Sequence, residues 1–278
     1  MNKTTLRNVA VNNIWKIPHA PRQQLFKLLQ PKSNHSFSRM RTIDPQTLQK
    51  EQISLQPYDR LKCIFFHIPK CGGISIGRAL FGHYYGNHMN ALTYQLIFDK
   101  QTYDSYFKFT FVRNPWSRLL SAFHYLRGNS PIVGDDERVW AKENIGHFSD
   151  FNEFVINWVT PENICQFEHF KPQHRYLASP DGQIQVDFIG RFETLARDFN
   201  YVSERLGIDT SLSHQNKAKR KKRDYRQYYS NTAREIVAEV YKRDIEGFGY
   251  HFDDAAEDAK KPSLIPHSVF RRQLPVIV

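Results

Sequence analysis

One stretch constrains the fold of this chain more than any other, the sequence LKCIFFHIPKCGGISI at positions 61–76. An apolar, aromatic-rich run ends in His-Ile-Pro-Lys, two glycines follow, and Ser75 opens a run with helical character. A strand, a tight glycine loop and a helix N-terminus bind phosphate or sulfate, because free backbone N–H groups point at the anion and the helix dipole adds to them. The stretch therefore predicts an anion-binding loop.

The spacing within this loop excludes two common anion-binding motifs. A Walker A motif carries its lysine after the last glycine, whereas Lys70 precedes Gly72 and Gly73. A cysteine phosphatase loop places its arginine closer to the cysteine than here, where six residues separate Cys71 from Arg78. A cysteine in such a loop can still have thiolate character, so the sequence leaves both the thiol and the thiolate form of Cys71 open.

Strands that alternate with helices predict an α/β fold with a parallel sheet. We expect the strands and helices at the following positions: strands at 61–67, 107–112 and 184–189, and helices at 21–29, 74–82, 92–99, 115–127, 136–143, 151–159, 192–206 and 231–246. Lys70 and Arg113 directly follow the first two strands. Ligands of such sheets lie at the carboxyl ends of the strands, so both cations are expected to face one crevice.

Composition narrows the class of partner and the compartment. With 39 Lys and Arg against 28 Asp and Glu, the net charge of +11 favours a polyanion, namely a nucleotide, an acidic polysaccharide, a nucleic acid or an anionic membrane. The 3 cysteines lack CxxC spacing, which argues against a disulfide framework or a zinc site. Since the sequence has neither an apolar run of about 18 residues nor a signal-peptide pattern, we expect a cytoplasmic protein. We expect the N-terminal segment to be an arm that packs on the main domain, and contact of this basic segment with a membrane or a partner is the alternative.

Four motifs carry a resemblance to a known family. They are HIPKCGGIS, FVRNPWSRLLSAFHYL some forty residues later, GRFETL at 190–195 and YKRDIEGFGYHF at 241–252. Together they resemble the sulfotransferase family that includes heparan sulfate 2-O-sulfotransferase, the chondroitin-type carbohydrate sulfotransferases and many bacterial relatives. The resemblance implies a P-loop-like α/β fold and the co-substrate 3′-phosphoadenosine 5′-phosphosulfate (PAPS). It covers about 61–252, within a predicted sulfotransferase domain at 58–252 that has an N-terminal extension at 1–57 and a tail at 253–278.

The chemistry of sulfuryl transfer assigns roles to the loop. Charge develops on the leaving oxygen, so catalysis is largely positioning and electrostatics. We expect Lys70 to stabilise the leaving phosphate and the Ser75 hydroxyl to assist. Backbone N–H groups of the loop should hold the 5′-phosphosulfate, through Cys71, Gly72, Gly73, Ile74 and Ser75. The family often has Thr at the positions of Cys71 and Ile74, so this loop depends more on its backbone and on Ser75.

The second motif supplies the other end of the predicted PAPS site. Arg113 and Ser121 are eight residues apart, about two helical turns, and the resemblance implies that they grip the 3′-phosphate. Arg118 is expected to be structural. Lys217 opens KAKRKKR, with six basic residues in seven. The position of this run matches a loop that closes over the nucleotide in relatives, although alone it reads as a solvated loop or a polyanion patch.

The acceptor side of the predicted site is less defined. His88 lies where related enzymes carry a catalytic histidine, and histidine suits a general base. The alternatives for the general base are His83, another residue, or no general base at all. His67 is expected to be a packed residue at the strand end. His169, Gln173, His174 and Arg175 lie in a segment that lines the acceptor cleft in relatives, or else form a structural turn. We expect no metal and no nucleic acid.

The sequence therefore predicts a PAPS-dependent transfer of sulfate to a hydroxyl, with a carbohydrate as the favoured acceptor. A small-molecule or lipid acceptor remains open, because the PAPS motifs do not identify it. From another class, a non-catalytic polyanion-binding protein also remains open.

Overall fold

The computed structural model describes residues 14–29, 40–44, 47, 54–82, 88–128, 133–179, 182–212 and 224–254. Its helices (α), 3-10 helices (η) and strands (β) are, in chain order, η1 Ile14–Lys16, α2 His19–Leu29, α4 Gln56–Leu61, β1 Cys63–Phe66, α5 Gly73–Phe81, α6 Ala91–Ile97, α7 Lys100–Ser105, β2 Phe107–Val112, α8 Pro115–Arg127, α9 Asp135–Asn144, α10 Phe151–Trp158, η3 Asn163–Cys165, α11 His174–Leu177, β3 Phe188–Arg191, η4 Phe192–Thr194, α12 Leu195–Arg205, η5 Tyr225–Tyr228, α13 Asn231–Val240 and α14 Lys242–Phe248.

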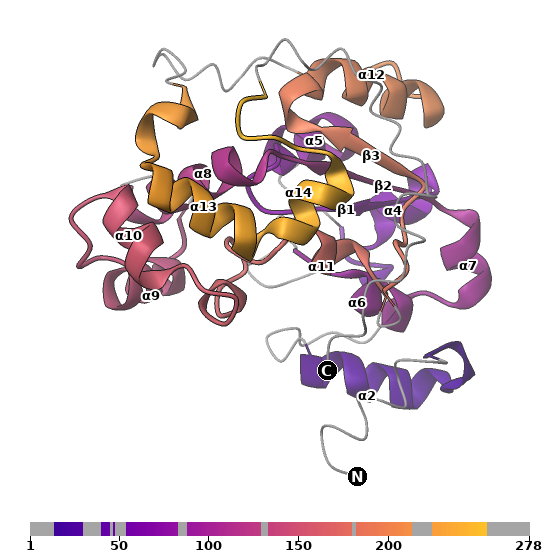
Figure 1. The fold of residues 1–278 in the computed structure, drawn as a ribbon. Helices are drawn as coiled ribbons and strands as arrows, with labels where there is room; N and C mark the ends of the chain where they lie inside the picture. The colour runs from indigo at the N-terminus through magenta and orange to yellow at the C-terminus, as the bar shows by residue number, and fades with distance from the viewer. Residues whose placement is uncertain are drawn as a thin grey trace.

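Within the described residues, three strands form one parallel sheet with β2 in the centre. Cys63 on β1 pairs with Phe107 on β2, and Phe109 pairs with Phe188 on β3. The strands are almost wholly buried, which explains their near-continuous apolar sequences, since helices pack around the sheet (Figure 1). The predicted α/β fold with a parallel sheet in a single domain is confirmed.

Two hydrophobic clusters fill the interior. One surrounds the sheet, and the other lies among α8, α9, α10 and α13, at the left of Figure 1. Helix α8 starts as the sequence predicts, with Pro115 in its first turn and the Asn114 side chain accepting hydrogen bonds from the N–H groups of Trp116 and Ser117. Its predicted apolar face is buried in the second cluster, through Leu119, Leu120, Phe123 and Leu126.

Two predicted elements differ from the structure, and three helices, α4, α7 and α11, were not expected. Strand β3 begins at Phe188 rather than Ile184, because the Asp187 carboxylate accepts a hydrogen bond from Lys108 N (2.7 Å) while Ile184 forms an isolated antiparallel bridge with Ala178. The predicted helix at 231–246 is interrupted at Tyr241, whose hydroxyl donates to the Phe170 carbonyl (2.7 Å) and whose ring is buried.

The helix of the N-terminal extension packs against α6 rather than standing apart (Figure 1). Phe26 on α2 is fully buried, and Arg22 Nη1 donates to the Phe98 carbonyl at 2.8 Å. This agrees with the prediction of an arm that packs on the main domain. Among the described helices, none is both long and apolar enough to cross a membrane.

Gly73, the first residue of α5, lies directly against the imidazole of His67. A Cβ atom at Gly73 would lie 1.8 Å from His67 Nε2. The His67 ring cannot easily withdraw, because it is only 3% exposed and stacks on Phe65 with 5.5 Å between ring centroids. Close packing therefore requires glycine at position 73 and fixes His67 as the packed residue that the sequence predicts.

We predict that Gly73→Ala lowers the free energy of unfolding by about 1–3 kcal/mol, because the added methyl group overpacks the His67 ring. Urea denaturation of the wild-type chain and the variant measures the change. The control is the same substitution in a His67→Ala background, where the methyl group has room and the cost should largely disappear. An equal cost in both backgrounds would contradict this packing argument.

Candidate functional site

The loop between β1 and α5 has the geometry of an anion cradle. Lys70 and Gly72 both have left-handed backbones, with φ angles of 69° and 86°. A lysine in this region is strained, and such strain persists where the surrounding structure holds it. The N–H groups of Gly72, Gly73 and Ile74 have no acceptor among the described residues, whereas Ser75 N donates to the Gly72 carbonyl at 3.1 Å. Three of the five predicted N–H groups, together with the start of α5, are thus available to an anion.

Lys70 carries its charge over an aromatic ring rather than beside a carboxylate. Its Nζ lies 3.6 Å from the centroid of the Tyr125 ring, a cation–π contact. No acidic group of the described residues lies within ion-pair distance of this nitrogen. Burial first and the nearby Arg113 second lower the pKa of Lys70 to about 8, although the charge of Glu137 acts in the opposite direction. An anion bound here would relieve both effects.

Arg113 lies beside Lys70, as the parallel strands predicted. Its Nη1 donates to the Lys70 carbonyl at 3.2 Å, and its guanidinium stacks over Phe192 at 4.3 Å. Burial lowers the pKa of Arg113, and the described residues place no carboxylate within ion-pair distance of it. Two cations therefore meet at the carboxyl ends of β1 and β2, and no carboxylate in the described part of the chain forms an ion pair with either of them.

The guanidinium of Arg113 has a hydroxyl partner that the sequence reasoning missed. Its Nε and Nη2 donate to Ser117 Oγ at 3.0 and 2.8 Å. The predicted partner Ser121 lies one turn further along α8, half-buried, and its hydroxyl has no partner among the described residues. Ser117 could have been found from its spacing, because it lies four residues from Arg113 on the first turn of α8.

A cluster of three histidines, His67, His88 and His169, lies next to Lys70. The imidazole of His88 is 4.4 Å from that of His67 and 5.7 Å from that of His169, measured between ring centroids. His88 Nδ1 donates to the His67 carbonyl (3.0 Å), since a carbonyl can only accept. In the neutral imidazole this leaves Nε2 as a free lone pair, 3.8 Å from Glu168 Oε1.

His169 is packed rather than exposed. It is 4% exposed and stacks on Tyr125, the ring beneath Lys70, with 5.0 Å between centroids. Burial lowers its pKa well below 6.5, and the neighbouring His88 and Lys70 add to this effect. The ring is therefore neutral, and its Nδ1 lies 3.6 Å from Glu137 Oε1 without a hydrogen bond. Glu137 also accepts from the Tyr125 hydroxyl at 3.2 Å.

Gln173 and His174 are used to hold the site together. The fully buried Gln173 amide exchanges hydrogen bonds with the backbone N–H and C=O of Arg113, both at 2.8 Å, and accepts from Cys71 Sγ at 3.3 Å. His174 Nδ1 donates to Asp244 at 2.7 Å. Burial alone would raise the pKa of Asp244, but the hydrogen bonds from His174 and the backbone lower it below its usual range. Of the four predicted acceptor contacts, Arg175 is the exposed one.

Cys71 and Arg118 are buried within the same loop. Burial raises the pKa of Cys71 to about 12, which favours the neutral thiol. The thiolate form, which the sequence left open, is therefore disfavoured. Arg118 is 1% exposed and donates to the carbonyls of Pro69, His169 and Lys171 at 3.1, 3.2 and 2.9 Å. These contacts fit the structural role expected for Arg118. The predicted residues Lys217 and His83 lie outside the described residues.

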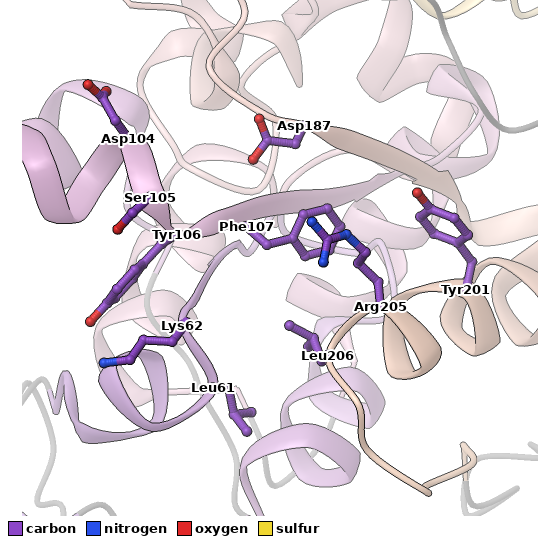
Figure 2. A pocket seen from close by; sticks show the side chains of 10 residues that line it. All are labelled: Leu61, Lys62, Asp104, Ser105, Tyr106, Phe107, Asp187, Tyr201, Arg205 and Leu206. Atoms are coloured by element: carbon purple, nitrogen blue, oxygen red, sulfur yellow. The ribbon is translucent and has the colours of Figure 1, made fainter.

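A cavity of about 520 Å³ lies at the amino ends of the strands, at the opposite end of the sheet from the anion cradle (Figure 2). Lys62 and Tyr106 line one side of it, and Tyr201 and Arg205 from α12 line the other (Figure 2). Because the anion cradle follows the strand ends, this cavity is not part of the candidate site.

Comparisons with known proteins agree with this geometry. The chain is similar to carbohydrate sulfotransferase 14 of Danio rerio (34% identity over 37% of this chain and 30% of the relative), to carbohydrate sulfotransferase 11 of Mus musculus (29% over 52% and 47%) and to carbohydrate sulfotransferase 9 of Homo sapiens (26% over 69% and 52%). The chain thus spans about half the length of these relatives or less. No solved structure matches it significantly.

The model of the sulfotransferase family matches residues 58–251, from the helix before β1 to the residues after α14. This match contains the anion cradle, both cations and the histidine cluster. The chain therefore belongs to the sulfotransferase family.

Proposed function

We propose that this protein transfers the sulfuryl group of PAPS to a hydroxyl of a carbohydrate. Membership of the sulfotransferase family supports the reaction class. The printed names of the relatives, carbohydrate sulfotransferases, support the acceptor class. The observation that carries the proposal is the pair of cations, Lys70 and Arg113, which meet beside free N–H groups of the loop and form no ion pair with a described carboxylate.

The residues of the site fit a nucleotide that has phosphate groups at both ends. The loop N–H groups of Gly72, Gly73 and Ile74 and the Ser75 hydroxyl would hold the 5′ end, beside Lys70. Arg113 would hold the 3′-phosphate, with Ser117 orienting its guanidinium and Ser121 available one turn away. PAPS supplies the activated sulfuryl group, and the protonated Lys70 stabilises the negative charge that develops on the leaving phosphate.

His88 is the proposed general base. Its Nδ1–H is fixed on the His67 carbonyl, so Nε2 holds the lone pair that takes the proton from the acceptor hydroxyl. The buried contacts of Gln173 and His174 support a scaffold role for these two residues, and the exposed Arg175 is the one available to an acidic glycan. Lys217 is proposed to close over the nucleotide.

Transfer to a small molecule or a lipid uses the same PAPS site, so a panel of acceptors separates these alternatives. Transfer of labelled sulfate to glycans, and not to small phenols, alcohols or lipids, is the expected result. A non-catalytic polyanion-binding protein would bind heparin but show no measurable affinity for 3′-phosphoadenosine 5′-phosphate, the product of PAPS. Calorimetry with that nucleotide therefore tests the proposal as a whole.

We predict that binding of 3′-phosphoadenosine 5′-phosphate at about pH 8.5 takes up a fraction of a proton. The free Lys70 loses its proton as the pH rises through about 8, and a bound phosphate raises the pKa of Lys70, so the ammonium is protonated again in the complex. Calorimetry in buffers with different ionisation enthalpies measures this uptake.

Lys70→Met should abolish the uptake. The matched control is Lys100→Met, since Lys100 is exposed and lies on α7, which borders the cavity at the other edge of the sheet. An uptake that persists in Lys70→Met would remove the assigned role of Lys70. Turnover of Lys70→Met should also fall by orders of magnitude with the fold intact.

We predict that His88→Ala slows sulfate transfer by about 100-fold to 10,000-fold, the usual contribution of a general base. The affinity for 3′-phosphoadenosine 5′-phosphate should stay within about twofold, a difference below 0.5 kcal/mol. Transfer of labelled sulfate and calorimetry measure the two quantities. His147→Ala, at an exposed position, is the control. If nucleotide affinity collapses with transfer, His88 belongs to the PAPS site instead.

A further inference from the structure

The fold brings together three metal-ligating side chains that lie far apart in the sequence. His88 precedes α6, whereas Glu168 and His169 lie between η3 and α11. One ligand atom from each of these residues lies within 4.8 Å of the other two. The sequence does not show this group, because about eighty residues separate His88 from Glu168.

His88 is already oriented as a metal ligand. Its Nδ1–H donates to the His67 carbonyl at 3.0 Å, and Nε2 lies 3.8 Å from Glu168 Oε1. A histidine that ligates a metal almost always donates its other ring N–H to a carbonyl or carboxylate in this way. The His67 carbonyl therefore fixes both the tautomer and the orientation.

His169 supplies a buried imidazole with unused capacity. Its side chain is 5% exposed, and its Nδ1 has no hydrogen-bond partner. A buried polar nitrogen without a partner is costly, so a metal ion bound through this nitrogen would offset that cost. The Glu137 carboxylate, 3.6 Å from this nitrogen, adds negative charge beside the neighbouring Lys70.

We propose that His88, Glu168 and His169 form a Zn²⁺ site that overlaps the proposed general base. Two imidazoles and one carboxylate are a familiar set of three zinc ligands, with a fourth position left to water. Mg²⁺ and Ca²⁺ prefer oxygen ligands and fit this set poorly. Zinc needs its ligand atoms about 3.4 Å apart, and Glu168, whose side chain is 44% exposed, has room to move inward.

Zinc at this site takes the His88 lone pair that would otherwise accept the proton of the acceptor hydroxyl. The ion is therefore a reversible inhibitor of transfer that leaves the nucleotide loop free. This consequence rests on the proposed function, whereas zinc binding itself does not.

The first test titrates the chelator-treated full chain with ZnCl₂ in competition with a chromophoric chelator. We expect Glu168→Gln to weaken zinc binding by at least tenfold, since it loses a ligand. Glu168 is partly exposed, so this variant should fold. Controls are Cys165→Ser and His147→Ala, which should bind zinc as the wild-type chain does. Equal affinity in Glu168→Gln and the wild-type chain would overturn the site.

X-ray absorption of the zinc-loaded chain provides a second measurement. Nitrogen and oxygen scatterers at about 2.0–2.1 Å support the site, and sulfur at about 2.3 Å would overturn it in favour of a cysteine site. Saturating zinc should leave the affinity for 3′-phosphoadenosine 5′-phosphate unchanged and should suppress transfer, with activity restored by chelator. If the chain binds zinc here but never transfers sulfate, the metal site stands and the proposed function fails.

Discussion

A single buried amide, that of Gln173, connects the parts of this structure on which the site depends. It holds the backbone of Arg113 at the end of β2 from both sides and accepts from Cys71 in the loop after β1. The backbone N–H of Gln173 donates to the Asp244 carboxylate on α14 at 2.6 Å. Gln173 therefore connects its own segment to three others that are distant in sequence. Since the hydrogen bonds of buried polar groups are costly to leave unmade, the arrangement is strongly specified.

This scaffold keeps two like charges together in a partly desolvated place. Burial is the main cause of the lowered pKa values of Lys70 and Arg113, and the neighbouring Arg113 adds to it at Lys70. The Tyr125 ring offsets a part of that cost for Lys70 without neutralising it, as a carboxylate would. The site is thus unfavourable by itself and favourable with a polyanionic ligand, which is the behaviour expected where binding takes precedence over stability.

Much of the fold could be predicted from the sequence, because strong local signals agree with the tertiary structure. Strand β2 and helix α8 have the predicted bounds, since an apolar run leads into an Asn cap and a proline. Tertiary contacts set the parts that were missed. The predicted last helix is interrupted at Tyr241, whose hydroxyl donates to the Phe170 carbonyl. Strand β3 starts only after Asp187, whose carboxylate accepts from Lys108 N. Neither contact leaves a periodic signal.

The candidate site was predictable where its residues follow strand ends, as Lys70 and Arg113 do. Residues brought in by long-range packing were not, such as Tyr125 beneath Lys70 and Glu137 beside His169. The hydrogen bonds of Gln173 to Arg113 and of His174 to Asp244 illustrate the same limit, because these contacts are a property of the folded chain alone.

Arg118 has a mechanical consequence for the candidate site. Its guanidinium donates to the Pro69 carbonyl in the anion loop and to the His169 and Lys171 carbonyls in the segment that carries two residues of the histidine cluster. A planar, rigid group thereby sets the separation between the anion loop and residues 168–171. A displacement of either segment would therefore act on the other through this one buried side chain.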